Sequence, residues 1–180
     1  MLKMKDILDE KDARLRLISK DVSFPLDNKD KKAINDMIEY LTKSQIEEIA
    51  EKENLRPGMG MAAIQLGINK RYFVVVHEVT EEDDEEQKFD TYVIINPEII
   101  SQSGTQIVEE GCLSFPNKFA KIERPENIKI RAINEKGKKI EISGKGLLAQ
   151  AISHEIDHLN GEVFIDKIIP GTLEIIKPEK

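Results

Sequence analysis

The chain has 180 residues, 39% of them hydrophobic, which suits one globular domain over residues 1–180 with its own core. Asp and Glu (34) outnumber Lys and Arg (27), and no basic stripe stands out, so the composition argues against nucleic-acid binding through phosphate neutralisation. With one cysteine, no signal-peptide core in residues 1–16 and no apolar stretch long enough for a bilayer, the sequence predicts a disulfide-free cytoplasmic protein that does not enter a membrane.

The first predicted element is an amphipathic helix from about Asn28 to Glu53. Apolar residues recur there at helical spacing and form the expected buried side: Ile34, Ile38, Leu41, Ile46 and Ile49. Pro57 and Gly58 then break the pattern. The stretch MAAIQLGINKRYFVVV, residues 61–76, predicts a strand approached through small residues. Within it, Gln65 is an amide among apolar neighbours and needs a hydrogen-bond partner.

Runs rich in Val and Ile predict six strands: Tyr72–Val76, Tyr92–Ile95, Glu98–Ser101, Gln106–Glu109, Ile128–Ile133 and Lys139–Ser143. The acidic run between the first two predicts a solvated hairpin loop. Residues 146–161, GLLAQAISHEIDHLNG, predict a helix that ends at Gly161. Several strands with a helix near each end predict an α+β fold, in which antiparallel or mixed sheets pack around this C-terminal helix.

The HEIDH sequence places His154 and His158 one helical turn apart, where both imidazoles can bind one metal ion, with Glu155 directed toward the same site. A helical wheel groups them with apolar residues on the core-facing half: Leu147, His158, Ala151, Glu155, Leu148, Leu159 and Ile152. The opposite half is polar: Gln150, Ser153, Asp157 and Asn160. Because burial of two imidazoles and a carboxylate without charge compensation is costly, we expect a divalent cation there.

Cys112, in the stretch EEGCLSFP, is the candidate third ligand, since catalytic metals usually combine three protein ligands with one water. One thiolate and two imidazoles suit Fe(II), Zn(II), Co(II) or Ni(II). Taken alone, Cys112 also fits a small buried hydrophobe or the nucleophile of a cysteine protease. The latter would use one histidine and leave the HExxH geometry without a purpose.

Three motifs in this order resemble those of the peptide deformylases. The family patterns G-x-G-x-A-A-x-Q, E-G-C-x-S and H-E-x-D-H read here GMGMAAIQ at 58–65, EGCLS at 110–114 and HEIDH at 154–158. The resemblance extends from about the first helix to GEVFIDKI, and the N-terminal segments are similar to the longer, Gram-positive-type members. It implies an enzyme that removes the N-formyl group from the formyl-methionine of newly made proteins and releases formate.

The resemblance also implies residue roles. Cys112, His154 and His158 would hold the metal, with Fe(II) as the native ion, and metal-activated water would attack the formyl carbon with Glu155 as general base and then general acid. The developing oxyanion would be received by Gln65 and the backbone N–H of Leu113. Substrate contacts would come from Gly58, Met59, Gly60, Gly111, Leu147, Gln150 and Ala151. The implied partners are N-formylmethionyl nascent peptides and the ribosome.

Two alternatives stay open at this point: a non-catalytic module stabilised by metal, and a metallopeptidase of different specificity. The chain departs from the family at Met61, where many members have Leu, and near Phe119, where many have Arg. Asp157 is either solvated or paired with Arg124, and Glu110 is either exposed or hydrogen-bonded around the site.

Overall fold

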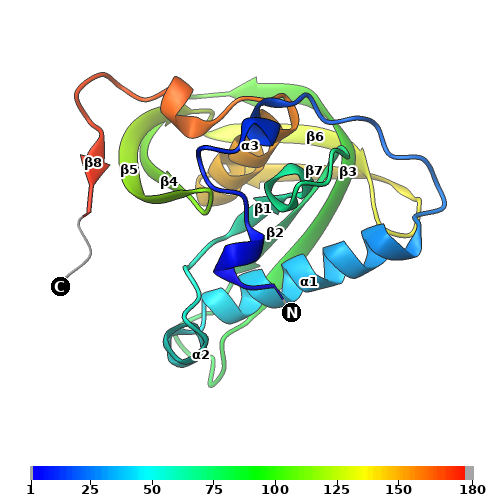
Figure 1. Cartoon of the computed structure of the whole chain (residues 1–180), viewed down its shortest axis with the longest axis horizontal. Helices are drawn as coiled ribbons and strands as arrows, with labels where there is room; N and C mark the ends of the chain where they lie inside the picture. The colour runs from blue at the N-terminus through cyan, green and yellow to red at the C-terminus, as the bar shows by residue number, and fades with distance from the viewer. Residues whose placement is uncertain (1, 177–180) are drawn as a thin grey trace.

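Two antiparallel sheets form the framework of the computed structural model, which describes residues 2–176 (Figure 1). The larger sheet has the order β1-β2-β3-β6-β7 and the smaller β4-β5-β8. The strands are β1 (Gly60–Ala62), β2 (Tyr72–Glu78), β3 (Phe89–Ser103), β4 (Gln106–Cys112), β5 (Phe115–Arg124), β6 (Asn127–Ile133), β7 (Lys139–Lys145) and β8 (Glu174–Ile175). The α-helices are α1 (Asn28–Ser44), α2 (Glu47–Glu53) and α3 (Leu147–Leu159). Short 3-10 turns span Met4–Asp6, Ala13–Arg16, Ala63–Leu66 and Phe164–Asp166. The α+β prediction is confirmed.

Strand β2 is buried on both faces because a helix covers each side of the larger sheet (Figure 1). Alternate side chains of a strand point to opposite faces. Tyr72, Val74 and Val76 therefore join a core with α1, whereas Phe73 and Val75 join a second core with α3. Strand β2 is thus continuously apolar from Tyr72 to Val76 rather than alternating, and it packs against α1 on one side of the sheet and α3 on the other.

The prediction of one helix over residues 28–53 is wrong, because α1 and α2 are separate. The chain leaves the helix at Gln45 and Ile46, and Ile46 takes an extended conformation. The Gln45 side-chain amide donates to the carbonyls of Leu41 and Val76, which ties the end of α1 to β2. Ile34 and Leu41 are buried as predicted, whereas Ile38, Ile46 and Ile49 are half-buried.

The strand predictions are corrected in two places. The predicted strands Tyr92–Ile95 and Glu98–Ser101 form one long strand, β3, whose pairing with β6 shifts register after Ile95. Strand β5 was not predicted, because Pro116, Lys118 and Lys121 interrupt its apolar pattern and it ends in an arginine. The acidic segment between β2 and β3 is a hairpin connection, as predicted.

Helix α3 is buried around most of its circumference, so the wheel's polar half is partly wrong. Ser153 and Asp157 are buried because β5 and the segment after α3 cover that side. Leu147, placed on the core-facing half, is the first residue of the helix and is 58% exposed. The helix ends at Leu159, and Gly161 has a positive φ of 73°, consistent with the predicted stop.

Along residues 2–176, no helix combines the length and the apolar character needed to cross a membrane.

Candidate metal centre

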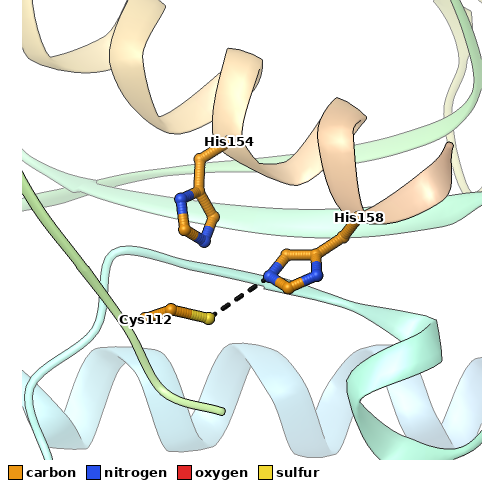
Figure 2. A group of neighbouring side chains, drawn as sticks. All are labelled: Cys112, His154 and His158. Carbon is orange, nitrogen blue, oxygen red and sulfur yellow. Dashed lines mark hydrogen bonds between the residues drawn. The ribbon is translucent and has the colours of Figure 1, made fainter. Parts of the chain in front are cut away.

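The HEIDH helix and the end of β4 bring three metal-binding side chains together. His154 and His158 come from consecutive turns of α3, and their ring centroids are 5.0 Å apart. Cys112 ends β4, and its sulfur lies 3.3 Å from Nε2 of His158 (Figure 2). One donor atom from each residue lies within 4.8 Å of the others. All three residues are buried.

This donor set fits a divalent cation. His154 uses Nδ1 to contact Glu110, which leaves its Nε2 as the donor toward the shared point. A thiolate with two imidazoles matches the preference of borderline-soft divalent metals. A catalytic metal also needs one coordination position open to water or substrate. A pocket lined by Cys112 and His154 gives access to the donor set.

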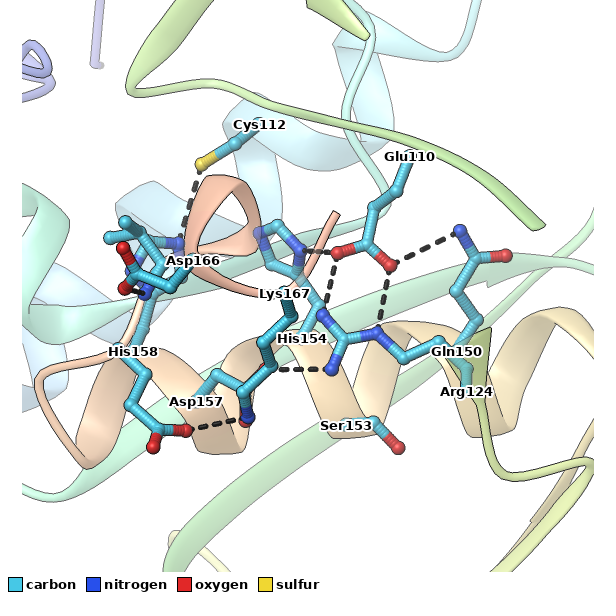
Figure 3. Close-up of polar contacts among 12 residues, drawn as sticks. Glu110, Cys112, Arg124, Gln150, Ser153, His154, Asp157, His158, Asp166 and Lys167 are labelled. Atoms are coloured by element: carbon cyan, nitrogen blue, oxygen red, sulfur yellow. Dashed lines mark hydrogen bonds and ion pairs between the residues drawn. The ribbon is translucent and has the colours of Figure 1, made fainter. Parts of the chain in front are cut away.

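Glu110 anchors His154 through a buried network (Figure 3). Its Oε1 lies 2.6 Å from His154 Nδ1, and the Arg124 guanidinium donates to both Glu110 oxygens at 2.9 and 2.6 Å. Arg124 also donates to Asp157 at 2.6 Å, and Lys167 reaches the other Asp157 oxygen. Burial alone would raise the pKa of Glu110, but hydrogen bonds from His154 and Arg124 lower it to about 2. The structure therefore pairs Asp157 with Arg124 and buries Glu110.

Glu155 is the contrasting carboxylate. It is 3% exposed, and no residue in the range 2–176 offers its Oε2 a hydrogen bond. Burial raises the pKa of Glu155 to about 7. Gly60 leaves room for it, since a Cβ at that position would stand 2.9 Å from the carboxyl carbon. A buried carboxyl group with a pKa near neutrality is suited to accept and return a proton.

The amide of Gln65 is oriented by its own 3-10 turn. Its Oε1 accepts the backbone N–H of Ala62 at 2.9 Å, so its nitrogen faces the other way. Nε2 donates to Ser114 Oγ at 3.1 Å and lies 3.6 Å from the Cys112 sulfur. The predicted buried amide thus has its partners and presents its N–H groups beside the candidate metal ligands.

A pocket of about 450 Å³ opens beside these groups. Every residue predicted to contact substrate lines it: Gly58, Met59, Gly60, Gly111, Leu147, Gln150 and Ala151. Gln65, Leu113 and Glu155 also line it, whereas His158 does not. Sequence reasoning missed Arg56, which lines the pocket; its signal was the RPG sequence, interpreted only as a helix break.

Comparisons with known proteins agree with this geometry. A family model described as polypeptide deformylase matches residues 4–173. A peptide deformylase of Halalkalibacterium halodurans is 43% identical over 93% of this chain and 92% of its own length. The crystal structure of a peptide deformylase from Thermotoga maritima is 36% identical, with a TM-score of 0.70 over 91% of this chain and 97% of that one. A Met-Ala-Ser-bound peptide deformylase from Acinetobacter baumannii is 28% identical, with a TM-score of 0.69 over 90% and 96%. The chain belongs to the peptide deformylase family and is an enzyme, as its three motifs predicted.

Proposed function

We propose that this chain hydrolyses the N-formyl group of N-formylmethionyl nascent peptides and releases formate. The observation that carries the proposal is that one pocket is lined by Cys112 and His154 of the Cys/His/His donor set, by the Gln65 amide and by Glu155. Within residues 2–176, Oε2 of Glu155 has no hydrogen-bond partner. Family membership supports the same reaction.

Cys112, His154 and His158 would hold the metal ion, with Fe(II) as the proposed native ion and Zn(II), Ni(II) or Co(II) as compatible ones. When bound, such an ion supplies Lewis acidity, which polarises the formyl carbonyl and acidifies a water.

The residues of the chain would move the proton and stabilise the charge. Glu155 would accept a proton from the attacking water and later donate it to the leaving amine, as its pKa near 7 allows. Gln65 Nε2 and the Leu113 N–H would donate to the oxyanion that develops on the former carbonyl oxygen.

The peptide would bind between two sheet edges. Strand β1 is at one edge of the larger sheet and β4 at one edge of the smaller, and both line the pocket. An open edge presents backbone N–H and C=O groups that an extended peptide can pair with, whatever its sequence. Met59, Leu147, Gln150 and Ala151 would receive the methionine side chain. The Met-Ala-Ser peptide bound by the Acinetobacter baumannii relative is consistent with this pocket. Nascent chains at the ribosome, in the cytoplasm, are the proposed setting.

A formate-release assay tests this function against its alternatives. The unaltered protein, loaded with Fe(II) or Ni(II) without oxygen, should release formate from formyl-Met-Ala and leave acetyl-Met-Ala and a blocked longer peptide intact. A chelator should abolish the reaction. Cleavage of the longer peptide would instead indicate a metallopeptidase. Activity that survives the chelator would indicate a thiol enzyme, and a metal-loaded protein inactive on every peptide would indicate a structural module.

A further inference from the structure

Arg56 connects the approach to β1 with the turn that follows β4. Its Nη2 donates to the carbonyl of Cys112 at 3.2 Å, and its Nη1 donates to the carbonyl of Leu113 at 3.0 Å. These two carbonyls flank the residue whose N–H is proposed to bind the oxyanion. One guanidinium thus holds both peptide groups of Leu113.

The planarity of the peptide bond gives this contact a direction. The Cys112 carbonyl and the Leu113 N–H belong to one trans peptide plane and point to opposite sides of the chain. A donor that holds the carbonyl on the Arg56 side therefore holds the N–H on the other side. Leu113 and Ser114 form the turn between the paired residues Cys112 and Phe115, and the β4–β5 register shifts between Gly111 and Cys112.

The backbone around Arg56 is itself held by α1. The carbonyl of Arg56 accepts a hydrogen bond from the hydroxyl of Tyr40, a fully buried residue, at 3.1 Å. Two residues on, the N–H of Gly58 donates to Ser44 Oγ at 3.2 Å. Pro57 restricts the Arg56 backbone further, because the residue before a proline is limited to extended conformations. The backbone of Arg56 is therefore fixed, so its guanidinium can hold the turn that contains Leu113 in one position.

The Leu113 side chain is confined by the same segment. A Cβ at Gly58 would stand 2.8 Å from Leu113 Cδ1, so the leucine packs directly against a position without a side chain. The segment 56–58 therefore holds Leu113 by its backbone and by its side chain.

We propose that Arg56 is a positioning residue, which orients the Leu113 N–H toward the developing oxyanion. The proposal rests on the proposed deformylase activity, since that reaction supplies the oxyanion. Arg56 acts on the transition state through the Leu113 peptide group and makes no contact of its own with the reacting atoms. A planar guanidinium with donors on separate nitrogens suits this task better than a lysine ammonium, whose three donors share one nitrogen.

The test compares Arg56→Ala and Arg56→Lys with the unaltered protein on formyl-Met-Ala. We expect Arg56→Ala to lower kcat by about 10- to 100-fold, less than the roughly 10²–10³-fold cost of deleting an oxyanion donor. KM should change little, because ground-state binding does not need this N–H. Metal content per chain should equal that of the unaltered protein. Arg56→Lys should have an intermediate kcat.

Gln45→Ala is the matched control. The Gln45 amide also donates to two backbone carbonyls, those of Leu41 and Val76, and it does not line the pocket. Loss of the Gln45 amide should destabilise the contact between the end of α1 and β2 and lower the melting temperature, while kcat stays unchanged. An equal fall of kcat in Gln45→Ala and Arg56→Ala would overturn the proposal, because general softening would then explain both.

Three further results would overturn it: parental kcat in a folded, metal-loaded Arg56→Ala protein, a defect confined to KM, or a defect matched by metal loss. If Arg56→Ala does not fold, Arg56→Lys carries the test, and parental kcat in that variant overturns the proposal. Failure of the proposed function looks different, since the unaltered protein itself would then release no formate.

Discussion

Glu110 and Glu155 are two buried carboxylates close to one candidate metal centre, and their surroundings are opposite. Glu110 is 5% exposed and accepts hydrogen bonds from Arg124 on both oxygens and from His154 on Oε1. Glu155 is 3% exposed, and its Oε2 has no hydrogen-bond partner in the part of the chain that the structure describes. The pKa of Glu110 falls to about 2, whereas that of Glu155 rises to about 7.

Burial alone therefore does not decide the charge of these groups, because both are buried. The hydrogen-bond partners decide it: where donors offset the lost solvation the carboxylate stays ionised, and where they do not, its proton is held more tightly. Glu110 is thereby suited to hold His154 in place, and Glu155 to exchange a proton. Substitution of Glu155 and of Arg124, the partner of Glu110, should separate proton transfer from the positioning of His154.

The largest effect is expected from Glu155→Gln, which keeps the shape of the side chain and removes its proton chemistry. Because general acid–base catalysis contributes about 10²–10⁴-fold, kcat for formate release should fall by that factor. Metal content should not change, and the free energy of unfolding should stay within about 1 kcal/mol, since no hydrogen bond of Oε2 is lost. A parental rate of formate release would refute the assignment of Glu155 as the base.

Arg124→Ala should disrupt the buried network around Glu110. The substitution leaves Glu110 and Asp157 buried after the loss of their shared cation. Removing one partner from a buried charge network costs about 3–5 kcal/mol, to be measured by urea unfolding. Arg131→Ala is the control, because that arginine pairs with Glu141 at the surface and its loss should change stability little. Equal stability of the two variants would contradict a structural role for the buried network.

Gln65→Leu tests the neutral amide donor that lines the same pocket as the two carboxylates. Loss of one oxyanion-hole donor should lower kcat by about 10²–10³-fold, with little change in KM. The Ala62 N–H would lose its acceptor, so the free energy of unfolding should fall by about 1–3 kcal/mol. A variant that loses this stability while keeping its kcat would show that Gln65 only supports the turn.

Lys167→Ala should have the smallest effect. Lys167 lies at the partly exposed end of the Glu110 network, where its side chain is 38% exposed, and Asp157 keeps its bond to Arg124 when Lys167 is removed. An exposed ion pair contributes about 0.2–1 kcal/mol, so unfolding and formate release should change little. A loss as large as that of Arg124→Ala would show that the buried pair depends on its exposed end.

The features that sequence predicted well are local ones. Residues four apart on a helix must share a face, so the HEIDH spacing placed His154 and His158 together before any tertiary contact was known. Gly161 was recognisable as a helix stop because glycine adopts a positive φ without strain. The continuous Val-rich run of β2 and the isoleucines of β6 and β7 indicated strands, because β-branched residues favour the extended backbone locally.

The features that sequence missed depend on partners far along the chain. Strand β5 places Arg124 in the interior, which contradicts the usual pattern until Glu110 and Asp157 are seen to surround it. Asp157 fell on the polar half of the wheel, and a periodicity of 3.6 residues cannot show that other segments cover that half. Arg56 carried no local signal beyond its position before a proline, because its role depends on two carbonyls more than fifty residues away.

The sequence by itself therefore determined which groups exist and which of them one helix presents together: two imidazoles and the carboxylate between them, followed by a glycine stop. Only the tertiary structure decided that Cys112 meets those imidazoles, that Glu110 is paired while Glu155 is not, and that Arg56 holds the turn carrying Leu113. The physical reason is distance along the chain. Helical geometry acts over a few residues, whereas the pKa of a carboxylate and the orientation of a peptide group depend on whatever the fold packs against them.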